Sequence, residues 1–419
     1  MLPGSMPSTE QSQLPTEVDE QNPWGKPPRD LPRWTAAPVT TAADVSIETL
    51  DLANKKDRKR FLDASDAVLS DDPNYIAPLR MERMRFLDTA HNASLSSLDI
   101  HALVATRNGK LVGRITAHVD RAYNDYHGEK VGWFGFFDSI DDLAVAHALL
   151  DRAVRWVKDA GMTQILGPNN FTTNHQVGML VENFSRPAVV EMTYNASYYE
   201  RLVTSYGFGK AKDLFAYWVD VSKGLHDPKI KRFYDVSQKA QKRYGLKLRG
   251  ARMQDFNDEV ALLFRLYNET WQKNWGFVPV GEAEFKNIAK DLKQIVVPEL
   301  VLLVEDKNGK PVAFSVTLPN INEIMPKNGR LFPFAWWRLL TGMKKIKTAR
   351  LFTLGVAPAH RRHGVEAMLC IETALRAKQL GYSSGEIGWT LEDNVLINRA
   401  VDSFGGKLDR RYRIFGLEL

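Results

Sequence analysis

Apolar and polar positions alternate in two stretches that each turn at an Asn-Gly pair, and this pattern predicts two β-hairpins. The first hairpin spans 102–117 and the second spans 301–316. An aromatic loop ending in proline precedes each hairpin, and a Gly-containing turn into a last strand follows each one. Equivalent features lie about 200 residues apart. A repeat of this length indicates duplicated domains rather than a solenoid.

The repeat divides the chain into two domains of one mixed α/β class, in which helices cover a mixed sheet. Each half should contain a strand, helices and the hairpin, followed by alternating strands and helices and by closing strands. The segment 1–43 is rich in Pro, Ser, Thr and Gln, which favours a disordered tail because this composition cannot bury a core. We predict a first domain over 44–222, an amphipathic connecting helix within 223–244 and a second domain over 245–419.

Composition narrows the class of protein without changing this organisation. The 419 residues are 44% hydrophobic and 25% charged, and the net charge of +6 suits polyanionic cofactors or an anionic membrane surface. No zinc-ligand spacing, helix-turn-helix signal or dense basic stripe indicates a metal or nucleic acid. The sequence shows no secretory signal and no apolar run near the ~20 residues that span a bilayer. We expect a cytoplasmic protein, and peripheral contact with the inner membrane stays open.

The run 351–364 combines a strand, a Pro-marked turn and an Arg-Arg-His-Gly loop that opens a long helix. The first N–H groups of a helix lack intrahelical partners and lie at the positive end of the helix dipole, so they form an anion site. Gly364 lets the backbone approach a phosphate, and Arg361 and Arg362 can add charge-assisted hydrogen bonds. The alternative interpretation is an ordinary strand, turn and helix with surface arginines.

The same run resembles the acyl-CoA pyrophosphate loop of the GNAT acetyltransferase superfamily, V-x-P-x-x-R-x-x-G-x-G/A, through Val356, Pro358, Arg361 and Gly364. The chain departs from this pattern at Glu366, whose carboxylate would lie close to the phosphates. The resemblance implies two tandem GNAT-like acyl-CoA N-acyltransferase domains, with acyl-CoA or acetyl-CoA as co-substrate and no metal. The residues expected to contact this co-substrate are Leu354, Val356, Arg361, Arg362, His363, Gly364, Val365, Asn394 and Asn398.

Asn394 belongs to this set because the family carries an asparagine just inside the helix that follows the next strand, and Asn398 is the alternative. A helix N-cap explains Asn394 equally well. The family often has a general-acid tyrosine seven residues later, where this chain has Val401. Tyr412 is a nearby candidate for that role, although packing in the last strand is the simpler explanation.

The first half has no comparable loop. Asp138, Asp141 and Asp142 would repel phosphates at the place where that loop should lie. We interpret this half as a degenerate partner domain that shapes the substrate cleft. Its loop 167–174 is dense in turn-forming and amide residues, and it either lines this cleft or is a plain structural turn.

Acyl transfer from a thioester to an amine requires a base for the amine proton and N–H groups that stabilise the oxyanion. The expected oxyanion site is the backbone of 354–356, where two parallel strands should separate. Glu386 and Glu392 are the candidate bases, and Glu392 is preferred because Trp389 and Asn394 lie near it. The alternative for Glu392, an acidic residue at a helix start, stays open.

Aromatic residues lie where the family forms its acceptor pocket, and they favour an apolar acceptor. The residues expected to bind it are Trp271, Trp275, Phe277 and Trp389. An insert over 330–347 leads from an aromatic and aliphatic stretch into lysines at 344, 345 and 347, a pattern typical of segments at anionic membrane surfaces. The alternative is a helix packed on its own domain, with Trp336 and Trp337 buried.

The segments 274–279 and 389–394 are similar to the N-W-G-F-V-P and W-x-L-E-x-N segments of tandem-GNAT proteins. The duplication and the acceptor-side aromatics also resemble the bacterial ceramide synthase group, which N-acylates a sphingoid long-chain base. The leading hypothesis is an acyl-CoA-dependent N-acyltransferase acting on an amphiphilic amine at the inner-membrane surface. Two alternatives stay open: an N-acetyltransferase for a soluble or protein amine, and a non-catalytic protein that binds CoA or lipid.

Overall fold

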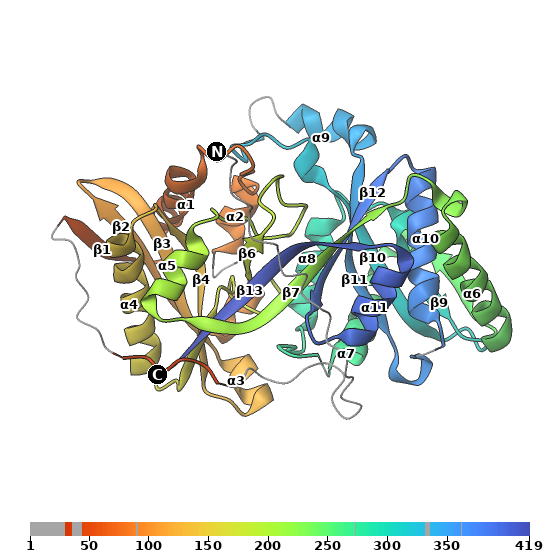
Figure 1. Ribbon diagram of the computed structural model, residues 1–419, viewed down its shortest axis with the longest axis horizontal. Helices are drawn as coiled ribbons and strands as arrows, with labels where there is room; N and C mark the ends of the chain where they lie inside the picture. Colours follow the sequence, from red (N-terminus) through yellow and green to blue (C-terminus); the bar gives the residue numbers. More distant parts are fainter. Residues whose placement is uncertain (1–29, 36–43, 89–90, 273, 332–335, 362) are drawn as a thin grey trace, which may run out of the picture.

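The computed structural model describes residues 30–35, 44–88, 91–272, 274–331, 336–361 and 363–419 (Figure 1). The elements of the first half are β1 (Val45–Leu50), α1 (Lys55–Leu69), α2 (Arg80–Phe86), β2 (Leu98–Arg107), β3 (Lys110–Asp120), α3 (Arg121–His127), β4 (Val131–Ser139), α4 (Leu143–Asp159), β5 (Gln164–Gly167), β6 (Met179–Glu182), α5 (Tyr199–Tyr206) and β7 (Gly209–Asp220).

The helix α6 (Pro228–Tyr244) connects this half to the second one, within the segment where a connecting helix was predicted. The elements of the second half are β8 (Lys247–Gly250), α7 (Phe256–Trp271), α8 (Glu282–Leu292), β9 (Val301–Glu305), β10 (Pro311–Pro319), α9 (Trp336–Gly342), β11 (Thr348–Val356), α10 (Val365–Gln379), β12 (Ser384–Leu391), α11 (Val395–Phe404) and β13 (Lys407–Glu418). Apart from β6, this element order repeats that of the first half. The alternation of helices and strands in both halves confirms the predicted mixed α/β class.

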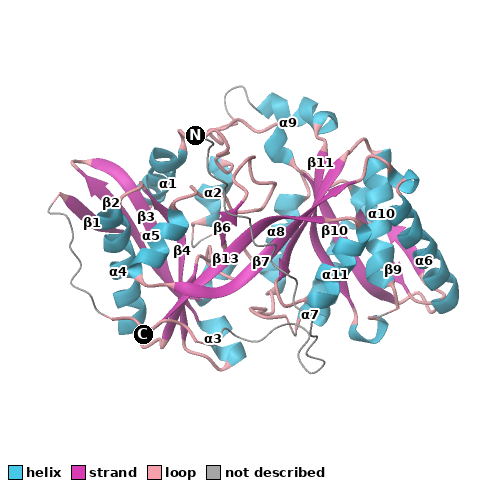
Figure 2. Cartoon of the chain, in the orientation of Figure 1, coloured by secondary structure: helices cyan, strands magenta, loops and turns pink. Residues whose placement is uncertain are grey.

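Both predicted hairpins are confirmed, and their local sequence explains them. β2 and β3 pair antiparallel around Asn108 and Gly109, whose φ angles of 51° and 75° lie in the left-handed region that a tight hairpin turn requires. Alternate residues of β2 enter cores on opposite faces of the sheet. Leu103 packs with the helix α4, whereas Val104 packs with α1. The sheet therefore carries helices on both faces (Figure 2).

The described strands form one continuous sheet across both halves, in the order β1-β2-β3-β4-β5-β13-β7-β12-β11-β10-β9-β8, with β6 beside β13. Each half is completed by the last strand of the other half. β13 pairs with β5 of the first half, β7 pairs with β12 of the second, and β7 and β13 pair with each other at the centre (Figure 1). The predicted segments 44–222 and 245–419 are therefore interlocked by exchanged strands rather than closed as separate sheets.

Part of the predicted tail is ordered against this sheet. The backbone N–H of Trp34 donates to the carbonyl of Glu418 over 2.7 Å, and Leu31 is buried in the core around Trp133. The prediction of disorder was wrong for residues 30–35, because two apolar side chains within a polar segment suffice to dock a short strand-like piece. The rest of 1–43 lies outside the described residues.

Candidate active site

The site begins where the parallel strands β11 and β12 separate, and this is the strand separation predicted beside residues 354–356. Pairing extends from Thr348 opposite Ser384 to Leu351 opposite Ile387 and then stops. Beyond this point, the backbone groups of β11 that face β12 have no partner strand on that side. Such an opening makes backbone N–H groups of β11 available to a bound ligand. Backbone N–H donors of this kind can stabilise an oxyanion.

The corresponding opening in the first half is closed by the chain itself. β4 and β5 pair only from Val131 to Trp133, and the segment after β5 then enters the gap. The N–H of Asn169 donates to the carbonyl of Phe134 over 2.8 Å, and a Cβ on Gly135 would lie 1.9 Å from the carbonyl oxygen of Asn169. The first half therefore offers no room for a ligand between these strands.

A single cavity of about 1850 Å³ extends from the gap between β11 and β12 into the space between the halves. Its walls include Leu354, Gly388 and Phe404 from the second half and Tyr75 from the first. The first-half loop that starts at Gly167 also contributes to the wall, since Pro168, Asn170, Thr173 and Asn174 line the cavity. Known ligand pockets measure roughly 300–1,000 Å³, so this cavity is large enough for a long, partly apolar substrate.

The four aromatic residues predicted to bind the acceptor all line this cavity. Phe277 is 4% exposed, and Trp275 packs against the core around Trp133. Trp271 lies at the end of α7, with its ring stacked on Tyr267 at a centroid distance of 5.3 Å. The structure thus brings together residues that are more than a hundred positions apart, from Trp271 to Trp389.

The loop before α10 has the predicted backbone conformation, but the side chain of Arg361 bonds to the protein backbone. Gly364 is the N-cap of α10 at φ 77°, and as a glycine it has no side chain to cap the first N–H groups of this helix. The Arg361 guanidinium donates to the carbonyls of Val356 at 3.1 Å and Thr270 at 2.7 Å, and so ties the loop to β11 and α7. Arg361 also lines the cavity, and burial lowers its pKa.

The other residues of this loop that were predicted to contact the co-substrate lie in different environments. His363 stacks on Tyr244 of α6 with ring centroids 4.3 Å apart, so its ring is held against the connecting helix. Val365 is fully buried and Val356 is 4% exposed. Glu366, the departure from the family pattern, lines the cavity, and burial raises the pKa of its carboxyl group. Arg362 lies outside the described residues.

The two predicted bases do not face the cavity. Glu392 accepts hydrogen bonds from Lys210 at 2.6 Å and from the backbone N–H of Asp213 at 2.9 Å, so its carboxylate points toward β7. Glu386 is fully buried beside Arg186, at 3.3 Å, and burial raises its pKa. Neither residue lines the cavity. Glu392 looked suitable because its sequence neighbours line the cavity, but successive side chains at a strand end point in different directions.

Asn394 and Asn398 are held by backbone groups of α11 and β12. Asn394 is the N-cap of this helix, because its side chain accepts from the N–H of Ile397 at 3.3 Å, and it also lines the cavity. Asn398 is fully buried and donates to the carbonyl of Leu391 at 2.9 Å. Tyr412 is fully buried in β13, which leaves packing as its role.

Arg350 is a feature of the site that the sequence analysis did not single out. Its buried guanidinium donates to the carbonyl of Gly388 at 3.1 Å on β12 and to the carbonyl of Val190 at 2.8 Å in the first half. Burial lowers its pKa, and the nearby Glu386 and Glu191 oppose that effect. Arg350 thus joins the splayed strands to the other half. A charged residue between Ala349 and Leu351 in an apolar strand was the available signal.

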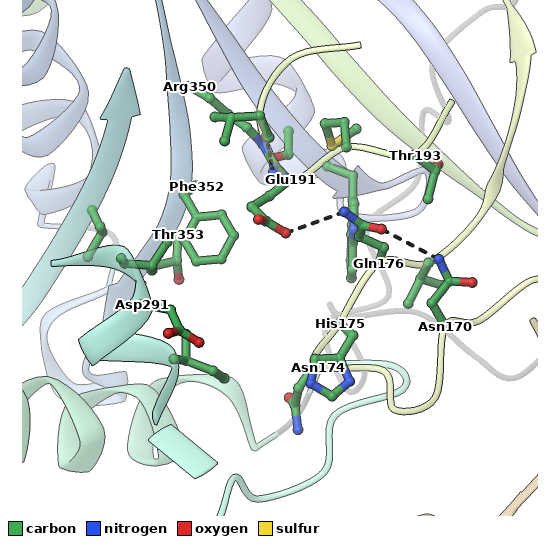
Figure 3. A pocket seen from close by; sticks show the side chains of 18 of the residues that line it. Asn170, Asn174, His175, Gln176, Glu191, Thr193, Asp291, Arg350, Phe352 and Thr353 are labelled. Carbon is green, nitrogen blue, oxygen red and sulfur yellow. Dashed lines mark hydrogen bonds between the residues drawn. The ribbon is translucent and has the colours of Figure 1, made fainter. Parts of the chain in front are cut away.

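Polar side chains from both halves converge on the middle of the cavity (Figure 3). Glu191, Gln176 and Asn170 form a hydrogen-bonded chain on the first-half side, with contacts of 3.4 and 3.5 Å. Thr353 and Asp291 lie across from them on the second-half side. An otherwise apolar cavity with a few convergent polar groups is typical of a substrate site in which the polar groups fix orientation.

His175 and Glu284 form a partly buried contact in the cavity wall, with Nε2 and Oε1 3.7 Å apart. Burial lowers the pKa of His175 to about 3 and raises that of Glu284 to about 7. Both groups are therefore neutral at pH 5, so this contact is not an ion pair. Because the carboxyl of folded Glu284 holds its proton above the ordinary value of 4.5, stability is lost as the pH rises from 4.5 through 7.

Replacing Glu284 by glutamine should remove this loss of stability. At pH 5 the variant and the parent should unfold at similar temperatures, whereas at pH 8 the variant should be more stable by about 2 kcal/mol. Thermal unfolding of both proteins at the two pH values measures the difference. Equal stabilities at pH 8 would show that Glu284 ionises as an ordinary carboxyl does.

The predicted insert 330–347 is described only in part. Trp337 on α9 is 60% exposed, contrary to the alternative in which it is buried, and Lys344 and Lys345 are exposed. The residues 332–335 and the side chain of Trp336 lie outside the described part of the chain. Within that part, no helix is both long enough and apolar enough to cross a bilayer.

The duplicated fold is that of the tandem GNAT type. A tandem GNAT protein from the clavulanic acid biosynthesis pathway matches 89% of this chain and 98% of its own length, with a TM-score of 0.53 at 12% identity. The chain is 36% identical over 370 residues to Protein YghO of Escherichia coli (strain K12), covering 86% of this chain and 93% of that protein. No family model matches.

A second relative is the bacterial ceramide synthase of Caulobacter vibrioides. It is 34% identical over 387 residues, which cover 90% of this chain and 98% of that protein. The chain belongs to the family that contains this synthase and Protein YghO. The predicted superfamily, its tandem organisation and the acyltransferase class are thereby confirmed.

Proposed function

We propose that this protein is an acyl-CoA-dependent N-acyltransferase that transfers a fatty acyl group to the amine of a sphingoid long-chain base. The observation that carries the proposal is the cavity of about 1850 Å³, which joins the gap between β11 and β12 to an aromatic space between the halves. The 34% identity to a bacterial ceramide synthase supports the same acceptor class. A small acetyl acceptor would fill little of this volume.

The donor is assigned to the second half. The N-terminus of α10 after Gly364 suits the pyrophosphate, and Leu354 and Val356 border the gap through which a pantetheine arm can pass. The buried hydroxyl of Thr353 has no hydrogen-bond partner among the described residues and faces the same gap. Backbone N–H groups of β11 beyond Leu351 supply the oxyanion site, since no strand pairs with them on the side of β12.

The acceptor is assigned to the part of the cavity between the first half and the aromatic side chains of the second half. Trp271, Trp275, Phe277 and Trp389 bury the hydrocarbon chain of a long amine at about 25 cal/mol per Å² of apolar surface. Access to such an amine is assigned to the membrane surface through the segment 330–347. The exposed Trp337 and the neighbouring lysines support this assignment, because indole rings favour the headgroup region and lysines favour anionic lipid.

Product analysis by mass spectrometry tests the proposal. Purified protein should convert a sphingoid amine, presented in anionic vesicles, to its amide when long-chain acyl-CoA is supplied. Acetylation of a soluble amine with acetyl-CoA would instead support the acetyltransferase alternative. Tight CoA binding without product from either amine would support a non-catalytic role.

Arg361→Ala should weaken CoA binding by about tenfold or more, because the loop before α10 loses its charge-assisted bonds to Val356 and Thr270. Isothermal titration with CoA measures the effect. Arg252→Ala is the matched control, since Arg252 is an exposed cation of the same half outside the cavity wall. Unchanged affinity in the Arg361 variant would refute the assignment of this loop.

A further inference from the structure

The segment 188–192 of the first half is fixed against the second half on both of its sides. The N–H of Val190 donates to Asn320 over 2.9 Å, and its carbonyl accepts from Arg350 at 2.8 Å. Asn322 donates to the carbonyl of Ala188 over 2.9 Å. Val190 itself is 3% exposed. These bonds hold the segment beside β11, at the place where the strands separate.

Glu191 is the ionisable residue that this segment presents to the cavity. Its φ of 58° lies in the left-handed region, which costs a non-glycine residue about 1–2 kcal/mol and persists only where the surroundings enforce it. Its carboxylate accepts from Gln176 at 3.4 Å and projects toward Phe352 and Thr353 of β11 (Figure 3). Its other charged neighbours are Arg350, Glu82 and Asp291.

We propose that Glu191 binds the acceptor ammonium and serves as the general base of the transfer, so that the first half supplies a catalytic residue to the donor site of the second. This inference rests on the proposed acylation of a long-chain amine. It is favoured because Glu191 faces the cavity beside β11, whereas Glu386 and Glu392 do not line it. Position with respect to the reacting atoms is the first requirement for a base.

The proton balance of this step is simple. The carboxylate of Glu191 takes one proton from the ammonium, and the neutral amine attacks the carbonyl carbon of the thioester. The C–N bond forms and the C–S bond breaks. A second proton passes from nitrogen to the departing thiolate, which leaves as the thiol of CoA, and Glu191 returns its proton to water. The amide and free CoA are the products.

Glu191→Gln keeps the size of the side chain and removes its charge. Its kcat/KM for the long-chain amine at pH 7 should fall by about 100-fold or more. Its rate should then rise about tenfold per pH unit toward the pKa of the amine, because the free amine no longer needs a base. A purely structural role would leave the shape of the pH profile unchanged. Glu269→Gln on α7 is the matched control, since Glu269 is exposed and lies outside the cavity wall.

A binding measurement separates this inference from the proposed function. Wild-type protein should bind octadecylamine more tightly than octadecanol, and the Glu191 variant should lose this difference by about tenfold or more while keeping its affinity for the alcohol. Equal binding of amine and alcohol by the wild type would overturn the role of Glu191. A variant with wild-type turnover and pH profile would overturn it too, while leaving the N-acyltransferase intact. If the Glu191 variant loses the binding preference but the wild type shows no turnover, Glu191 recognises the ammonium group and the proposed acyltransferase activity is refuted.

Discussion

Arg350→Met should lower the free energy of unfolding by about 3–5 kcal/mol, because it removes a buried cation that bonds two backbone carbonyls. The carbonyls of Val190 and Gly388 would lose their donor, and the buried Glu386 would lose one of its compensating charges. Methionine fills a similar volume, so the effect comes from the lost interactions rather than from a cavity. Chemical denaturation monitored by circular dichroism measures the change.

Arg265→Met, an exposed arginine on α7, is the control for this experiment and should change stability by less than about 0.5 kcal/mol. A loss below 1 kcal/mol for the Arg350 variant would show that the contact between the halves is held by other bonds. A large loss would identify Arg350 as the residue that fixes the first-half segment 188–192 beside β11.

Thr353→Trp should reduce acyl transfer by about 100-fold while leaving the protein folded. Thr353 lines the cavity beside the strand gap, so an indole ring would occupy space that we assign to the acyl-thioester. A displacement of 1 Å in the reacting groups can cost about this factor. Turnover with long-chain acyl-CoA and the thermal unfolding temperature are the two measurements.

Thr204→Trp on α5 makes the same chemical change at an exposed position outside the cavity wall. It should leave turnover within about twofold of the parent, since surface changes away from a site have small effects. Full activity in the Thr353 variant would place the acyl-thioester somewhere other than this gap. Loss of activity together with unfolding would instead indicate overpacking of β11.

Local features of the fold were predictable because short segments specify them. The Asn-Gly turns fixed both hairpins, and the strand, Pro turn and Gly364 located the N-terminus of α10. The exchange of β7 and β13 was not predictable in this way. The pattern of buried residues in each of these strands does not reveal which strand lies beside it. Pairing depends instead on contacts between residues far apart in the chain.

The candidate site shows the same division. The aromatic wall followed from residue type, since large aromatic side chains beside an expected pocket tend to line it. The choice of Glu392 failed as a prediction of what faces the cavity, because it relied on closeness in sequence, whereas Lys210 on an exchanged strand draws that carboxylate away. Glu191 and Arg350 meet across the halves and are 159 residues apart, so no local pattern could have joined them.

The exchanged strands also bear on how the chain folds as it leaves the ribosome. β5 pairs with β13, which is synthesised only after the whole second half. Until then, β5 presents an unpaired edge of the kind that invites association with other chains. N-terminal domains commonly fold first during synthesis, but here the first half lacks a central strand and must wait for it. Nascent chains are therefore expected to need protection of this edge, and the two halves to reach the native state in a single late step.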